Sequence, residues 1–343
     1  MMRYDPARTG HAQGETGPMG NVTEEWYYES SGMVSSYPAV VDNSIYYVGR
    51  KGGVYAKSAS AGSENWKFEM GGSANESSPA VVDGTVYVGS LNGTVYALSA
   101  SDGTEEWSFD TGESIYSSPA VTDNRVYITT GKTGGGQGNL YALNAADGTE
   151  QWRYETGDFI ISSPALADGT VYFGNRGNRV YAVSASDGTE QWSFETEKRV
   201  KATPAVADGT VYVGDDSGNL YALSASEGTE RWSYEADDTV DSSAAVADGT
   251  VYFGAQKLNA LSASDGSENW SFETEGGVGT SPTVADGAVY FGGNQSVYAV
   301  SVSDGTERWS LDVGGVVNSV VVADGTVYVG MLSAPRGVRA LTA

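Results

Sequence analysis

A single phrase, repeated to the end of the chain, restricts what this sequence can fold into. Its clearest copy is GTVYALSASDGTEEW at residues 93–107. The apolar run VYAL suits a β-strand, Asp-Gly suits a tight turn because glycine takes positive φ at no steric cost, and a second strand carrying tryptophan follows. Every tryptophan belongs to this series, at Trp26, Trp66, Trp107, Trp152, Trp192, Trp232, Trp270 and Trp309. The repeat of about 40 residues must therefore be explained first.

Each repeat contains four extended segments. In residues 77–110 they read SSPAV, GTVYVG, VYALSA and EEWSFD, and we name them strands A, B, C and D. Four strands in about 40 residues predict one blade of a β-propeller. Most strands A carry a proline, such as Pro79 and Pro119. Because proline lacks an N–H group and is tolerated at a sheet edge, we expect strand A innermost, lining the channel, and strand D outermost.

The two ends of the chain predict how the ring closes. VTEEWYYE at residues 22–29 is a strand D without A, B or C before it, and the chain ends at Ala343 after a strand C. We therefore expect an all-β, eight-bladed propeller of four-stranded antiparallel blades, closed by pairing of the N-terminal strand with the last blade. An irregular lead, residues 1–21, precedes a single domain, 22–343. The predicted blades 1–7 are about 34–70, 76–110, 116–155, 161–195, 201–235, 241–273 and 279–312, with 22–29 and 317–343 forming blade 8.

The phrase YALSASDGTEEWSF resembles the tryptophan-docking motif of the pyrroloquinoline-quinone-type (PQQ-like) β-propeller repeat. The resemblance covers residues 22–343 and implies that the turn between strands C and D and the tryptophan lock neighbouring blades together. The eight tryptophans are thus expected to be structural. In the PQQ-containing enzymes of this type, cofactor and substrate occupy the face formed by the B–C and D–A loops. Those enzymes also carry vicinal cysteines, a calcium ion held by Glu, Asn and Asp, and long extra loops.

Composition excludes several functions. Lys and Arg number 19 and Asp and Glu 44, so the net charge is −25, which disfavours nucleic acid as a partner. A carboxylate-rich, lysine-poor chain suggests a halophilic, archaeal source, although a merely solvated acidic surface explains the same composition. No apolar stretch is long enough to span a membrane, and no signal peptide is evident. Cysteine is absent, which excludes disulfides and thiolate metal sites. We expect an exported or cell-surface monomer.

The B–C/D–A face carries the most variable ring position and the one strongly basic patch. Three residues before the strand-A proline position the chain reads Ser35, Glu76, Tyr116, Ile161, Lys201, Asp241, Gly279 and Val317. Drift of an unconstrained loop accounts for this variation, and so does a ligand site at the channel mouth. The basic segment, residues 197–201, lies between blades 4 and 5. If the channel mouth is a ligand site, an anionic small molecule or a partner protein binds at Lys198, Arg199, Lys201, Arg176, Asp241, Glu76 and Tyr116.

Other motifs carry less chemistry. His11 is the only histidine, and with no cysteine the usual nucleophile–base pairs are missing. The string Gly-Lys-Thr at residues 131–133 is not a phosphate-binding loop, because Val126 stands where that motif requires glycine. The aspartates of the C–D turns lack calcium-loop spacing and are expected to stabilise turns.

Three functions remain open. The first is a non-catalytic ligand-binding or protein-binding scaffold without metal or cofactor, and this is the function we expect. The second is a minimal PQQ- and calcium-dependent oxidoreductase. The third is a sensor module of a larger receptor or kinase.

Overall fold

The computed structural model describes residues 8–30, 32–71, 77–131 and 136–343. Within these ranges the chain forms eight antiparallel four-stranded sheets. Blades 1–4 consist of β2 (Ala39–Val41), β3 (Ser44–Gly49), β4 (Gly53–Ser58), β5 (Glu64–Glu69); β6 (Ala80–Val82), β7 (Thr85–Gly89), β8 (Thr94–Ser99), β9 (Glu105–Asp110); β10 (Ala120–Val121), β11 (Arg125–Thr129), β12 (Gly138–Asn144), β13 (Glu150–Thr156); and β14 (Ala165–Ala167), β15 (Thr170–Gly174), β16 (Arg179–Ser184), β17 (Glu190–Glu195).

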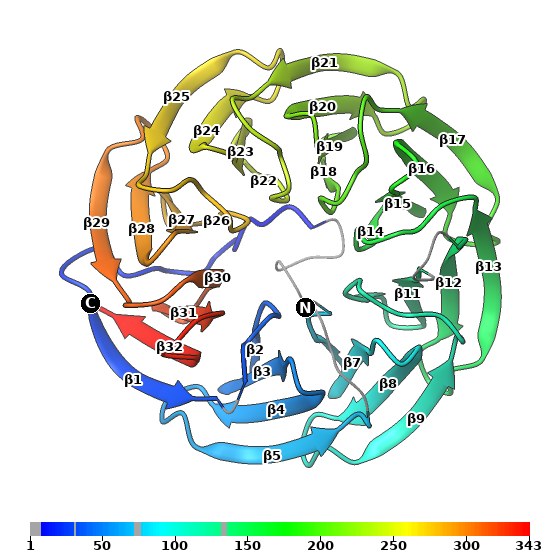
Figure 1. The fold of residues 1–343 in the computed structure, drawn as a ribbon, viewed down its shortest axis with the longest axis horizontal. Helices are drawn as coiled ribbons and strands as arrows, with labels where there is room; N and C mark the ends of the chain where they lie inside the picture. The colour runs from blue at the N-terminus through cyan, green and yellow to red at the C-terminus, as the bar shows by residue number, and fades with distance from the viewer. Residues whose placement is uncertain (1–7, 31, 72–76, 132–135) are drawn as a thin grey trace.

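Blades 5–8 follow the same order until the last. They consist of β18 (Ala205–Ala207), β19 (Thr210–Gly214), β20 (Asn219–Ser224), β21 (Glu230–Glu235); β22 (Ala245–Ala247), β23 (Thr250–Gly254), β24 (Lys257–Ser262), β25 (Glu268–Glu273); β26 (Thr283–Ala285), β27 (Ala288–Gly293), β28 (Ser296–Ser301), β29 (Glu307–Asp312); and β30 (Val317–Ala323), β31 (Thr326–Met331), β32 (Gly337–Thr342), β1 (Thr23–Glu29). The predicted eight-bladed fold is therefore confirmed (Figure 1).

Strand A is innermost in each blade and strand D outermost, as predicted (Figure 1). Strands A and B are joined by two-residue turns such as Asp83-Gly84, in which both residues have positive φ, 48° and 76°. This backbone matches the right-handed twist of a hairpin, and Asp and Gly are the residues that tolerate it best. In six of the eight blades an Asp-Gly dipeptide therefore sets the reversal between strands A and B.

The ring closes through the two ends of the chain. β1 pairs antiparallel with β32, and the pairing runs from Thr23 opposite Thr342 to Glu29 opposite Gly337. Across this pair Arg339 forms an ion pair with Glu24. The predicted pairing of the N-terminal strand with the last blade is thus confirmed, and every strand C has a strand D beside it.

Neighbouring blades are joined by the tryptophans. Seven indole N–H groups donate to a carbonyl in the C–D turn of the next blade, at 2.9–3.3 Å. Trp66, for example, donates to the carbonyl of Ala100, and the turn glycine Gly103 lies against its ring. The hydroxyl of Tyr46 donates to the same carbonyl at 3.2 Å. Burying this much aromatic surface between sheets stabilises each blade only when its neighbour is present.

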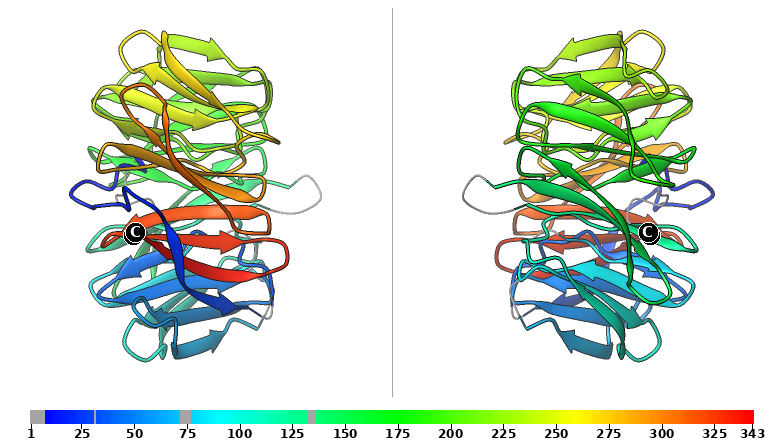
Figure 2. Two further views of the ribbon diagram at one scale, coloured as in Figure 1. Left: turned by 90° about the vertical axis from the view of Figure 1, so that its left-hand side faces the viewer. Right: turned by 90° about the vertical axis from the view of Figure 1, so that its right-hand side faces the viewer.

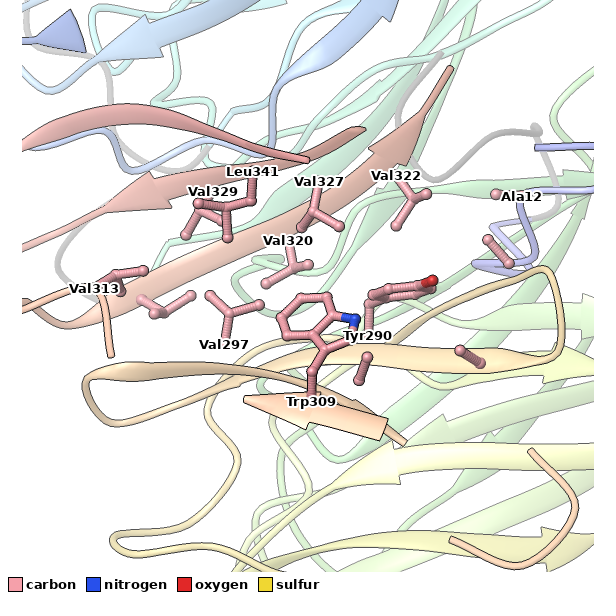
Figure 3. Close-up of a cluster of buried hydrophobic side chains, with 14 of the residues drawn as sticks. Ala12, Tyr290, Val297, Trp309, Val313, Val320, Val322, Val327, Val329 and Leu341 are labelled. Atoms are coloured by element: carbon pink, nitrogen blue, oxygen red, sulfur yellow. The ribbon is translucent and has the colours of Figure 1, made fainter. Parts of the chain in front are cut away.

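The last of these contacts uses the N-terminal lead instead of a C–D turn. Trp309 donates to the carbonyl of Pro18 at 2.8 Å. Figure 3 shows Trp309 and Tyr290 of blade 7 packed against valines of blade 8, with Ala12 of the lead beyond Tyr290. Gly17 lies so close to the Tyr290 hydroxyl that a Cβ there would collide with it. The lead therefore fills the place of the C–D turn that blade 8 lacks.

The lead also enters the channel from the face of the A–B and C–D turns, and in edge-on views it lies on one side of the disc (Figure 2). The N–H of Val246 donates to the carbonyl of Thr9, and the N–H of Val284 donates to that of Gly10. The buried guanidinium of Arg8 donates to the carbonyls of Ser118, Pro119 and Pro164. Residues 8–18 therefore cross the channel and tie together blades on opposite sides of the ring.

Candidate functional site

A closed circle of hydrogen bonds surrounds the channel axis at the start of strands A. Blades 1–7 each contribute one residue, whose backbone N–H donates to the side-chain hydroxyl of the residue from the following blade, at 2.8–3.2 Å. Blade 8 contributes none, so blade 7 donates to blade 1. The residues, in order around the circle, are Tyr37, Ser78, Ser118, Ser163, Thr203, Ser243 and Ser281. Tyr37 completes it because its longer side chain reaches past blade 8 to the N–H of Ser281. We call this set the hydroxyl circle.

The hydroxyl circle frames a cavity of about 200 Å³ at the channel mouth on the B–C/D–A face. The cavity is lined by residues that include six of the predicted ring positions, Ser35, Tyr116, Ile161, Lys201, Asp241 and Gly279. Glu76 lies outside the described residues. In blade 8 the prediction of Val317 is wrong, because a bulge in the β30–β31 pairing buries Val317 and places Asn318 at the cavity instead. The variable ring position thus lines one cavity, and ligand binding there stays a prediction.

The basic segment beside blade 5 is largely neutralised by carboxylates. Lys201 Nζ lies 2.9 Å from Asp216 Oδ1 and 3.2 Å from Asp241 Oδ2, and Arg199 also pairs with Asp216. Two cations and two carboxylates sum to no net charge. The charges of Arg199 and Lys201 are therefore largely neutralised, because the B–C loop of blade 5 supplies Asp216, and ligand binding at these residues stays a prediction. Lys198, which is exposed, forms no ion pair within the described residues.

The pKa values in this charge cluster follow the hydrogen bonds. Burial opposes ionisation of Asp216, but the hydrogen bonds from Lys201 and Arg199 outweigh it and lower the pKa of Asp216. Burial and the hydrogen bond with Asp216 raise the pKa of Asp241 despite the nearby Lys201. Burial also opposes the charge of Lys201, yet Asp216 and Asp241 together raise its pKa. Lys201 therefore stays protonated at neutral pH and bridges the two carboxyl groups.

The opposite side of the mouth is aromatic. Tyr116 lies with its ring centroid 5.3 Å from that of Phe159, and the Arg176 guanidinium lies 4.8 Å from the Phe159 ring. The N–H of Arg176 donates to the carbonyl of Phe159, which holds the B–C loop of blade 4 against the D–A loop before it. Arg176 is exposed and makes no ion pair within the described ranges. Tyr116, Lys201 and Asp241 line the mouth cavity, whereas Arg176 does not. The loop of Arg176 adjoins the basic segment, because the N–H of Val200 donates to the carbonyl of Asn175 at 2.9 Å.

Ser35 adds a further polar group to the cavity. It is 8% exposed, and its hydroxyl oxygen has no hydrogen-bond partner in the part of the chain that the structure describes. A buried hydroxyl without a partner costs free energy, so most such groups are satisfied. A ligand that hydrogen-bonds Ser35 would remove that cost.

On the face formed by the A–B and C–D turns, aspartates stabilise the turns. In the C–D turns of blades 2, 3, 4, 6 and 7, an aspartate accepts hydrogen bonds from the backbone and side chain of the residue two positions on. At Asp102 the N–H and hydroxyl of Thr104 lower the pKa of the carboxyl group. This supports the turn-forming role predicted for these aspartates. The described residues contain no group of three His, Cys, Asp or Glu side chains suited to a metal ion.

Sequence reasoning missed three residues at or beside the mouth, Asp216, Tyr37 and Asn318, and one in the channel, Arg8. Asp216 follows Asp215 in a loop where other blades have no such pair, and this was an available signal. Tyr37 was visible as the one aromatic residue before a strand-A proline. Asn318 and Arg8 gave no signal, because a bulge and a buried lead depend on packing that the repeat does not contain.

Comparison with known proteins agrees with this architecture. The family model described as outer membrane protein assembly factor BamB matches residues 13–89, 50–176, 115–244 and 236–334. Comparison with curated protein sequences gave no match. The ranges described contain no helix long and apolar enough to cross a membrane.

Solved structures show the same fold at low sequence identity. BamB from Moraxella catarrhalis is 18% identical, with a TM-score of 0.76, over 94% of this chain and 100% of that one. A quinohemoprotein alcohol dehydrogenase from Comamonas testosteroni is 16% identical, with a TM-score of 0.84, over 99% and 79%. A europium-containing methanol dehydrogenase is 13% identical, with a TM-score of 0.83, over 100% and 97%. From the family-model match, this chain belongs to the PQQ-like β-propeller family described as outer membrane protein assembly factor BamB.

Proposed function

We propose that this protein is a non-catalytic binding propeller, and that the channel mouth on its B–C/D–A face receives a small anionic ligand or a segment of a partner protein. One observation carries the proposal. Six of the eight positions that escape the repeat consensus line one cavity, whose lining includes the unpartnered hydroxyl of Ser35. The repeat keeps structural residues nearly constant around the ring, so variation gathered at one cavity is typical of a recognition surface.

The remaining cations favour an anionic group on the ligand. Lys198 and Arg176 stand on D–A and B–C loops of the same face, and neither forms an ion pair within the described residues. Arg199 and Lys201 form ion pairs with Asp216 and Asp241, so they offer a ligand hydrogen-bond donors of fixed position but little net charge. The ligand proposed here combines one anionic group with hydrogen-bonding groups that reach the hydroxyl circle.

Photo-cross-linking tests this proposal. A photoreactive residue replaces Tyr116 at the mouth in one variant and Asp265 on the opposite face in another, and each variant is exposed to extract of the native source. We expect position 116 to capture a defined partner or small molecule that position 265 does not capture. Adding Lys198→Ser and Arg176→Ser should reduce that capture at least fivefold. Equal cross-linking at positions 116 and 265 would contradict the proposal. So would cross-linking at position 116 that is unchanged by Lys198→Ser and Arg176→Ser.

An oxidoreductase is the alternative, because two of the similar structures are dehydrogenases by name. The mouth favours no calcium-bound quinone, because Asp241 is the one carboxylate among the described residues that line it and is paired with Lys201. The eight tryptophans are also occupied between blades. We propose no bound cofactor. Addition of PQQ and calcium, followed by dye-linked assays with primary alcohols, should give neither a shifted quinone absorbance nor turnover.

The family description adds a role in assembly, which belongs to the proteins of that name. For this chain we propose the coarser role of a monomeric scaffold, exported or at the cell surface. A sensor module of a larger receptor remains the third alternative, and its ligand would occupy the same mouth. Size measurement by light scattering tests the monomer.

The charge of −25 carries a separate proposal, adaptation to high salt. Eight A–B turns each place one exposed aspartate on the same face. Salt screens their mutual repulsion, since the Debye length falls to about 3 Å at 1 M salt. The unfolding temperature should therefore rise steeply between roughly 0.1 M and 2 M KCl. A flat response would remove this proposal and leave the binding proposal unaffected.

A further inference from the structure

A second cavity lies on the same face, at the seam between blades 8 and 1. It has a volume of about 380 Å³ and is lined by Met33, Arg50, Val316, Leu332 and Ser333, together with Ser35 and Asn318. Ser35 and Asn318 also line the channel mouth, so the two cavities adjoin. We call the second one the seam cleft. Its volume falls in the range of small-molecule sites, about 300–1,000 Å³.

The seam cleft exists because blade 8 departs from the repeat. One wall is the D–A segment of blade 8 joined to its B–C loop, where the N–H of Val316 donates to Ser333 Oγ at 2.7 Å and the N–H of Leu332 donates to the Val316 carbonyl at 2.9 Å. The other wall belongs to blade 1, where the N–H of Arg50 donates to the Met33 carbonyl at 3.0 Å. Both walls are therefore held in place by backbone hydrogen bonds.

The cleft exposes apolar surface that the fold leaves uncovered. Val316 is 37% exposed, and only it and Met19 are exposed large hydrophobic residues within the described ranges. Leu332 and Met33, both half-buried, continue the apolar surface inward. An exposed valine is unremarkable alone, but here it forms the lip of a cavity with two further apolar side chains.

The cleft also holds a cation without a counter-ion. Arg50 is exposed and forms no ion pair in the part of the chain that the structure describes; its Nη1 donates to Met33 Sδ at 3.1 Å, and a thioether is a weak acceptor. No carboxylate is among the lining residues. Arg50 thus differs from Arg199 and Lys201, which are neutralised by carboxylates on the same face.

We propose that the seam cleft binds a small monocarboxylate with an apolar body. The alkyl or aryl body lies on Val316 and Leu332, the carboxylate pairs with the Arg50 guanidinium, and the buried Ser35 hydroxyl at the inner end donates a hydrogen bond to an oxygen of the ligand. A guanidinium presents several N–H donors that match a carboxylate. The seam cleft shares Ser35 and Asn318 with the channel mouth, but its apolar wall and Arg50 do not line the mouth, so the carboxylate assignment rests on residues of the cleft alone.

Calorimetry with three probes tests each part of this assignment: octanoate, octanamide and acetate. Octanoate should bind the full chain at least tenfold more tightly than octanamide, which has the same body without the charge, and than acetate, which lacks the body. Arg50→Gln should weaken octanoate binding at least tenfold, in line with the strength of hydrogen bonds to charged groups. Val316→Asp should weaken it similarly by placing a carboxylate at the lip.

Arg336→Gln is the matched control, because Arg336 is an exposed arginine in the B–C loop of blade 8, beside the cleft, and does not line it. It should leave octanoate binding within twofold of the unsubstituted chain. Equal binding of octanoate and octanamide, or an unchanged affinity in Arg50→Gln, would overturn the proposal. Lys198→Ser with Arg176→Ser separates the two sites, since these substitutions should reduce capture at the mouth while octanoate binding stays the same.

Discussion

Blades 2 and 8 occupy equivalent places in the ring but are held by different parts of the chain. Strand A of blade 2 is three residues long and follows Pro79, whereas β30 is seven residues long, with Val320 at the proline position. Ser78 of blade 2 belongs to the hydroxyl circle. The corresponding Ser319 of blade 8 is buried and donates to the carbonyl of Ser36 instead.

The hydrogen bonds that blades 2 and 8 receive from the preceding blade also differ. Trp66 and Tyr46 both donate to Ala100 in the C–D turn of blade 2. Toward blade 8, Trp309 donates to Pro18 of the lead, and the Tyr290 hydroxyl has no partner within the described residues. A blade can thus lose most consensus contacts when neighbouring segments replace them. The replacement is incomplete, because the Tyr290 hydroxyl keeps no partner within the described residues.

The largest expected effect concerns the two tryptophans that dock onto these blades. Trp66→Ala and Trp309→Ala should each lower the free energy of unfolding by about 3–5 kcal/mol, the usual cost of emptying a buried aromatic site. Both side chains are 7% exposed and both donate one hydrogen bond, so the two losses should agree within about 1 kcal/mol. Urea unfolding followed by circular dichroism measures both. A loss at Trp309 below half that at Trp66 would mean that the lead is a poor substitute for a C–D turn.

The hydroxyl circle allows a comparison of intermediate size. Ser78→Ala leaves the N–H of Tyr37 without its acceptor, and Tyr37→Phe does the same to the N–H of Ser281. Each substitution should cost about 1–3 kcal/mol, because a buried donor is left unsatisfied. Hydrogen exchange at the two orphaned amides is the sharper measurement, and each should exchange at least tenfold faster only in its own variant. If the Ser281 amide kept its protection in Tyr37→Phe, the circle would not close through Tyr37.

The smallest effect separates the two tyrosines. Tyr46→Phe removes a hydrogen bond to Ala100 and should cost about 0.5–1.5 kcal/mol. Tyr290→Phe removes a buried hydroxyl without a partner, so stability should stay unchanged or increase slightly. Thermal unfolding of the two variants beside the parent decides the question. A clear loss of stability in Tyr290→Phe would show that blade 8 satisfies this hydroxyl after all.

Much of the fold was predictable because it depends on local signals that recur. Asp-Gly turns, apolar strands and regularly spaced tryptophans define the blade, and a strand D before the first complete repeat indicates how the ring closes. The position of Lys201 and its equivalents around one cavity also follows from the repeat. The ion pairs of Lys201 with Asp216 and Asp241 were not predicted, since they join loops of two blades whose distance the repeat does not specify.

The sequence alone determined how many blades there are, which strand faces the channel and which residues vary at its mouth, because each of these depends on patterns within about 40 residues. Only the tertiary structure decided that Tyr37 reaches past blade 8, that Pro18 receives Trp309, and that Arg50 stands without a carboxylate beside an apolar cleft. These features arise where the repeat ends and segments more than 200 residues apart come into contact. No local pattern encodes such contacts, since they depend on the closed ring.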